Sequence, residues 1–162
     1  PWSVLAQGIS LNVNLSIGAI TLIISITVLL FWIPLRQKPG IGTILNALII
    51  AAMIDICIKF VPTPVGYYSQ LILAIIAVLT VGLGGGIYLV ANLGAGPRDG
   101  LMVGLQKKTN LPIAAVRAFL EISAVSIGWY LGGTVGPGTL LFAFGIGPAV
   151  ALSLYLVGKV FS

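Results

Sequence analysis

Charged residues are scarce in this chain: only 7% of its 162 residues are Asp, Glu, Lys or Arg, while 59% are apolar. A soluble domain of this size carries about a quarter charged residues, because its surface must face water. The chain also has no His and one Cys, Cys57, which argues against zinc, haem and iron–sulfur sites and excludes an intrachain disulfide. A soluble enzyme, a secreted disulfide scaffold and a nucleic-acid-binding domain are therefore excluded.

The apolar residues instead form long continuous runs. Because lipid offers the backbone no hydrogen-bond partners, each span must satisfy its own, which favours α-helices. Five segments are long enough to cross about 30 Å of hydrocarbon: 15–33, 41–60, 71–91, 113–131 and 139–157. A shorter polar segment, 97–110, predicts a cytoplasmic or re-entrant helix. The predicted fold is an all-α, polytopic transmembrane helical bundle in contact with the lipid bilayer.

The placement of the basic residues predicts the orientation of these spans. Lys and Arg occur in alternate links and after the last span: Arg36, Lys38, Arg98, Lys107, Lys108 and Lys159. The links 61–70 and 132–138 have none. The positive-inside rule then places the basic links and the C-terminus in the cytoplasm. No basic leader precedes the first apolar run, so we expect no cleavable signal peptide.

The sequence matches itself without a gap when it is shifted by 96 residues. This shift places Pro1 on Pro97, Gly8 on Gly104, Asn14 on Asn110, and residues 40–45 on 136–141. The matches predict two repeats, 1–66 and 67–162, within one membrane domain. Each repeat would have three spans, so the second must be inserted upside down, and a leading span, the sixth, is expected before Pro1. Inverted repeats are typical of secondary transporters.

Two motifs within these repeats resemble those of a known group. The stretch Leu93-Gly94-Ala95-Gly96-Pro97-Arg98-Asp99 resembles the LGxGPxD signature of the YczE/YyaS/YitT family of bacterial membrane proteins, and Lys38-Pro39-Gly40-Ile41-Gly42-Thr43-Ile44-Leu45-Asn46 is similar to its PGIGTLLN turn. The resemblance is closest to the YczE branch and implies a bacterial inner-membrane protein without adding an activity. Arg98 stands where the family often has Trp, and Trp2 keeps that Trp in the first copy.

Ionisable residues inside the spans are the first candidates for a functional site, because charge is costly in hydrocarbon. Arg117 and Glu121 lie four residues apart on one helix face and can form an ion pair. Their counterparts in the first repeat are Thr21 and Ser25. These four residues predict the lining of a central solute-binding cavity. The alternative is a neutralised structural pair.

Three further residues are weaker candidates. Asp55, four residues before Lys59, is a candidate for proton or cation coupling, or simply the partner of that lysine. Thr43 and Thr139 are the last residues of the two Gly-x-Gly-Thr turns and would bind an anion at a helix N-terminus. Capping of the helix is the simpler interpretation of both threonines.

Small and aromatic residues predict packing and interfaces rather than chemistry. The pair Gly82 and Gly86 has the spacing of close helix–helix contacts. Gly145, Gly147 and Pro148 predict a kink or an unwound turn in the last span. Aromatic residues fit belts at the membrane interface: Trp32, Trp129, Tyr67, Tyr68 and Tyr130.

The function predicted from these features is passage of a small solute, an anion being one option, across a bacterial inner membrane. The other class left open is an accessory or assembly subunit within a larger membrane complex. A homodimer is also compatible with the sequence. An intramembrane enzyme is not expected, because Ser/His, Cys/His and paired-Asp constellations are missing. No metal site is predicted, and the identity of any cofactor stays open.

Overall fold

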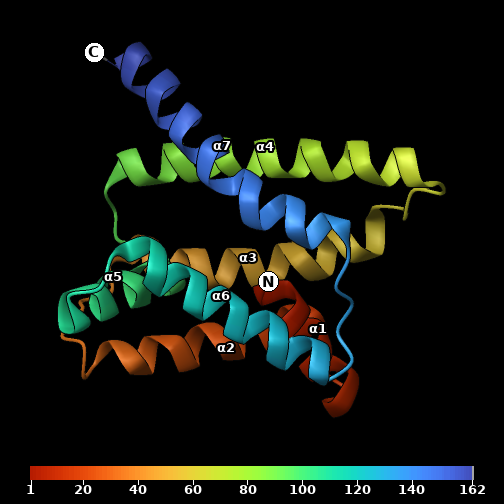
Figure 1. Cartoon of the computed structure of the whole chain (residues 1–162), viewed down its shortest axis with the longest axis horizontal. Helices are drawn as coiled ribbons and strands as arrows, with labels where there is room; N and C mark the ends of the chain where they lie inside the picture. Colours follow the sequence, from red (N-terminus) through yellow and green to blue (C-terminus); the bar gives the residue numbers. More distant parts are fainter. Residues whose placement is uncertain (162) are drawn as a thin grey trace. The chain divides into compact units, whose positions relative to one another are not determined.

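The computed structural model describes the backbone of residues 1–161 and, within this range, every side chain except those of 113, 158, 160 and 161. This part of the chain forms seven α-helices and no strand. The helices are α1 (Trp2–Val13), α2 (Ile17–Trp32), α3 (Ile41–Phe60), α4 (Tyr67–Ala91), α5 (Pro97–Thr109), α6 (Ile113–Tyr130) and α7 (Pro137–Phe161). Figure 1 shows their course. The predicted all-helical fold is confirmed.

Each predicted span corresponds to one helix, and the predicted short helix is α5. By length and apolar composition, α3, α4 and α7 can each cross a membrane alone. The pair α1 and α2, which are bent by 114° across a short break, could supply a fourth crossing or a re-entrant loop. The chain is thus an all-helical membrane protein with three or four candidate spans, and the five crossings stay a prediction.

The helices pack into two compact units. Unit 1 consists of Pro1–Val61 and Gly94–Thr134, and unit 2 of Pro62–Leu93 and Val135–Ser162. Unit 1 therefore contains α1, α2, α3, α5 and α6, while unit 2 contains α4 and α7. Both units include segments of both predicted repeats, and the division of the sequence at residue 66 stays a prediction.

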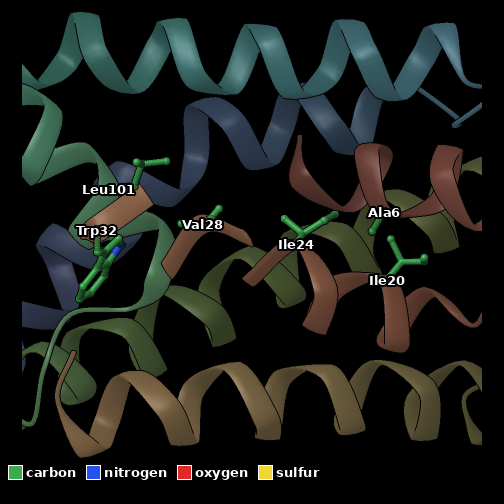
Figure 2. Packing of buried hydrophobic residues seen from close by; sticks show 6 residues of the cluster. All are labelled: Ala6, Ile20, Ile24, Val28, Trp32 and Leu101. Carbon is green, nitrogen blue, oxygen red and sulfur yellow. The ribbon is translucent and has the colours of Figure 1, made fainter. Parts of the chain in front are cut away.

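Helix α2 supplies four of the six residues of the buried hydrophobic cluster in unit 1. Ile20, Ile24, Val28 and Trp32 follow one another along this helix, with Ala6 of α1 and Leu101 of α5 in the same cluster (Figure 2). Only 3% of Trp32 is exposed, and its Nε1 donates a hydrogen bond to the Pro97 carbonyl oxygen at 2.9 Å. The predicted interfacial position of Trp32 is therefore wrong. Its indole N–H bonds to the Pro97 carbonyl oxygen inside the protein, so the ring can be buried in the core.

Glycines bring the helices of unit 1 close together. A Cβ atom on Gly100 of α5 would overlap the Trp32 indole ring, and one on Gly128 of α6 would lie 2.5 Å from the Leu5 backbone nitrogen. Gly8 of α1 similarly faces the backbone of Gly128 and the side chain of Leu131. These contacts position α5 against α2 and α1 against α6.

Unit 2 is an α4–α7 pair that also depends on glycine. Gly82 lies against Ala149, and Gly86 against Ser153, whose hydroxyl donates a hydrogen bond to the Leu83 carbonyl oxygen at 3.0 Å. The predicted close packing of Gly82 and Gly86 is confirmed. Helix α7 continues through Pro148, so the predicted unwound turn is wrong, while the alternative of a kink stays a prediction. Packing of Ala149 and Ser153 on α4 holds the turns after this proline in helical form.

Candidate functional site

Helix α6 carries an ion pair in unit 1. The Nε of Arg117 lies 3.0 Å from Oε1 of Glu121, and the two side chains are 40% and 17% exposed. It is the one ion pair found in the described part of the chain. The spacing of four residues therefore produces the pairing that the sequence predicts, with Arg117 partly accessible.

Thr21 and Ser25 lie on the buried face of α2. Their hydroxyls donate hydrogen bonds to the carbonyl oxygens of Ile17 and Thr21, at 2.8 and 2.9 Å. Only 3% of Thr21 and 5% of Ser25 is exposed. Both hydroxyls are thus satisfied within their own helix. Their predicted role in lining a solute cavity remains a prediction.

The two threonines of the Gly-x-Gly-Thr turns cap their helices. The fully buried Thr43 accepts a hydrogen bond from the Gly40 backbone N–H at 3.1 Å and donates one to the Ala95 carbonyl oxygen at 2.6 Å. In unit 2, Thr139 accepts from the Gly136 N–H at 3.4 Å. Thr43 therefore also ties the start of α3 to the loop before α5. These contacts fit capping and leave anion binding by either threonine untested.

Asp55 holds the first turn of α2 against α3. Its carboxylate accepts hydrogen bonds from the Ser16 hydroxyl at 2.6 Å and from the Gly18 N–H at 2.8 Å. A carboxylate at this position stabilises exposed N–H groups and the positive end of the helix dipole. The carboxylate is thus engaged in a structural contact, and its coupling role stays a prediction.

The residue that sequence reasoning passed over is Arg98, in the first turn of α5. Its guanidinium lies over the Trp2 ring, 4.9 Å from the ring centroid, so the two residues that correspond across the predicted repeat touch. Burial lowers the pKa of Arg98 to about 10, which leaves it cationic at neutral pH. Within residues 1–161, Arg98 has no ion-pair partner, and the buried Nε1 of Trp2 has no hydrogen-bond partner.

Asp99 connects Arg98 electrostatically to the ion pair on α6. Helix α5 begins at Pro97, so Asp99 lies inside the first turn. Burial raises the pKa of Asp99, although part of its side chain remains solvent-exposed, and the charges of Arg117 and Arg98 act in the opposite direction. We call Arg98, Asp99, Arg117 and Glu121 the arginine cluster. It contains two cations and two carboxylic acids, and Arg98 is the cation without an ion-pair partner.

A sequence signal for Arg98 existed. It follows the stretch Leu93-Gly94-Ala95-Gly96-Pro97, whose glycines separate two helical segments. A cation beside such an interruption can contact a ligand. Among the residues that the structure describes, no three His, Cys, Asp or Glu side chains gather to hold a metal ion. The chemistry available in the cluster is therefore charge pairing and hydrogen bonding.

Comparison with known proteins gives three findings. Residues 1–154 match the family of unknown function DUF6198. An uncharacterized protein of Haemophilus influenzae is 44% identical over 159 residues, which cover 98% of this chain and 73% of that protein. The uncharacterized membrane protein YczE of Bacillus subtilis is 32% identical over 155 residues, covering 95% of this chain and 72% of that protein. No solved structure matches the chain.

Proposed function

The chain belongs to the DUF6198 family of YczE-like membrane proteins, and we propose that it carries a small anionic solute across the bacterial inner membrane. The observation that carries this proposal is Arg98, a cation without an ion-pair partner among the described residues, at the start of a helix. We propose the re-entrant form of the short helix α5, so that Arg98 lies within the membrane, where a charge marks a pathway or a pair by default. We interpret Arg98 as part of a pathway, because it has no ion-pair partner among the described residues.

The surroundings of Arg98 favour an anion as the ligand. Helix α5 has 13 residues, and its first turn lacks a side-chain cap, which leaves N–H groups and the positive end of the helix dipole available. Arg117 adds a second cation, but Glu121 already pairs with it. An entering anion would therefore engage Arg98 first and reach Arg117 only by competing with Glu121. Such competition keeps Arg117 neutralised by Glu121 when the site is empty.

The proposed transporter architecture is an inverted repeat. One pair of helix ends supports it: α1 ends at Val13 and α5 at Thr109, and in each case the next residue, Asn14 or Asn110, has a left-handed backbone. The helix starts support it as well, because α2 and α6 begin at Ile17 and Ile113, and α3 and α7 at Ile41 and Pro137. Each pair of ends or starts has the same separation as Pro1 and Pro97.

Packing in unit 1 follows the same correspondence. Gly104 of α5 lies against Leu35 after α2, while the matching Gly8 of α1 lies against the matching Leu131 after α6. A common ancestral contact, made twice, accounts for both. We further propose that the basic links and the C-terminus face the cytoplasm, following the positive-inside rule.

Uptake into proteoliposomes tests the function. Purified protein is reconstituted, and the entry of labelled chloride, acetate and phosphate is compared with entry into protein-free liposomes. We expect faster entry of at least one of these anions. Arg98→Gln should slow it by about tenfold or more, because a hydrogen bond to a charged group contributes about 1.5–3 kcal/mol and each 1.4 kcal/mol is tenfold in binding.

The matched control is Lys159→Gln, which removes one exposed cation near the end of α7. Its uptake rate should equal that of the unmodified protein. Arg117→Ala and Glu121→Gln should each reduce uptake as well, because either change alters the charge balance of the cluster. Uptake at the wild-type rate in all three cluster variants would refute the proposed site. Failure of all three anions to enter would contradict anion transport.

A further inference from the structure

A second feature of unit 1 is an apolar groove near the end of α2. It has a volume of about 500 Å³ and is lined by α2 and the link that follows it, by α5 and by α6. Leu101, Leu105 and Leu120 contribute to its wall, and Phe31 is exposed beside it. This volume lies within the range of about 300–1,000 Å³ for small-molecule sites. The lining therefore suits an elongated apolar group.

Basic residues surround one part of this groove. Lys108 lines it directly, and Lys107 is its neighbour in the last turn of α5. Arg36 and Lys38 lie on the link after α2, and this link packs against α5, where Gly104 faces Leu35 and Gln37. The link and the end of α5 lie at the same end of unit 1 (Figure 1).

No acid lies on the link or in the later part of α5, and the acids of α5 and α6, Asp99 and Glu121, belong to the arginine cluster. Residues 31–40 and 101–109, which form the link and most of α5, contain no Asp or Glu. None of the four cations has an ion-pair partner among the described residues. Lysines near a helix C-terminus do stabilise the helix dipole, and this effect explains Lys107 and Lys108 in part. It does not act on Arg36 and Lys38, whose place on a link fits the positive-inside rule, and neither effect explains the apolar groove beside these cations.

We propose that this groove holds an acyl chain of an anionic phospholipid, whose phosphate pairs with Lys108 and the neighbouring cations. An apolar wall with charge at one end fits an amphiphile better than a polar solute. Basic pockets between membrane helices bind anionic lipid headgroups in this way. The charge complementarity selects an anionic lipid over a zwitterionic one. The inference does not rest on transport, because it concerns other residues and a resident ligand.

Lipid-dependent thermal stability tests the proposal. The purified full chain is kept in a neutral detergent and titrated with phosphatidylglycerol or with phosphatidylcholine of the same acyl chains. We expect phosphatidylglycerol to raise the unfolding midpoint at lower concentration. The double variant Lys107→Gln/Lys108→Gln should bind phosphatidylglycerol about 30-fold more weakly, since two cations near the headgroup are lost.

The matched control is Lys59→Gln/Lys159→Gln, which removes the same charge from the ends of α3 and α7. Its phosphatidylglycerol response should be unchanged. Equal responses to the two lipids, or equal losses in the two double variants, would overturn the proposal.

Two further measurements separate the acyl chain from the headgroup. Leu105→Trp fills the groove and keeps every cation, so it should weaken phosphatidylglycerol binding. Soluble glycerol phosphate carries the headgroup charge without a chain, and we expect no shift of the midpoint at concentrations where the lipid acts. A shift by glycerol phosphate equal to that by the lipid would instead indicate a site for free phosphate esters. The lysine variants keep the test valid if Leu105→Trp does not fold, because both lysines are exposed.

Discussion

Most of the polar side chains singled out in unit 1 have partners that serve the fold. Asp55 accepts two hydrogen bonds from the start of α2, Thr43 joins α3 to the Ala95 carbonyl, and Ser25 bonds within its own helix. Burying such groups without partners would cost about 1–3 kcal/mol each. Arg98 differs from them, because its recorded contact is with the face of an aromatic ring. This difference is the reason for which we propose a ligand at Arg98.

Trp32 is the residue on which the packing of unit 1 depends most clearly. Trp32→Phe would remove the hydrogen bond to the Pro97 carbonyl and leave a small void beside Gly100. We expect the free energy of unfolding to fall by about 1–3 kcal/mol. Denaturant titration in detergent measures this change. Trp129→Phe is the matched control, because Trp129 is 69% exposed, and it should change stability by no more than about 0.5 kcal/mol. Equal losses in both variants would contradict the assigned role.

At the level of single residues, the sequence predicts contacts between neighbours on one helix but not contacts between residues far apart in the chain. The Arg117–Glu121 pair follows from a spacing of four residues on a helix. The partner of Asp55 lies 39 residues away, and that of Trp32 lies 65 residues away. No local pattern encodes either contact, so the sequence alone suggests Lys59 as the partner of Asp55 and the membrane interface as the place of Trp32.

Among the elements, the α4–α7 pair shows how glycine position decides a helix contact. Gly82 and Gly86 lie one turn apart and face Ala149 and Ser153, whereas Gly84 has no atom within 4 Å of where its Cβ would be. Without a hydrophobic driving force between helices in lipid, such close contact supplies the packing energy. The same residue type thus makes a close helix contact on one face of α4 and faces open space on another.

Substitution of these glycines by alanine tests that distinction. Gly86→Ala should destabilise unit 2 by about 1–3 kcal/mol, because the new methyl group overlaps Ser153 and the overpacked helices must separate. Gly84→Ala should be neutral or stabilising by up to about 1 kcal/mol, because alanine favours helix more than glycine does. The midpoint of thermal unfolding in detergent measures both changes. A loss in Gly84→Ala as large as that in Gly86→Ala would show that the contact does not hold the pair together.

Six of the seven helices of the described residues match segments named from hydropathy and polarity, whereas α1 is not among those segments. Helix α3 spans the predicted 41–60, and Asn92 and Asn110 end α4 and α5 with a left-handed backbone, which Asn tolerates. The unbroken course of α7 could not be predicted, because its neighbour α4 stabilises the turns around Pro148. Hydropathy also does not encode the sharp bend between α1 and α2.

For the whole molecule, composition predicted the class and left the activity open. With 7% charged residues, the chain has to place most of its surface in lipid, and the family relationship agrees with a membrane protein. The proposed transport follows from the arginine cluster and the internal correspondence of helices. An accessory subunit would have the same composition and glycine contacts, so the two functions differ first in whether the protein acts alone.

The native mass of the protein, extracted from its own membrane in a mild detergent, tests this point most directly. Mass spectrometry of the intact particle, with identification of co-purifying proteins, measures both size and partners. A self-sufficient transporter predicts a monomer or a homodimer that migrates without other proteins. Stoichiometric migration with a large membrane complex would contradict the account and identify the chain as an accessory subunit of that complex.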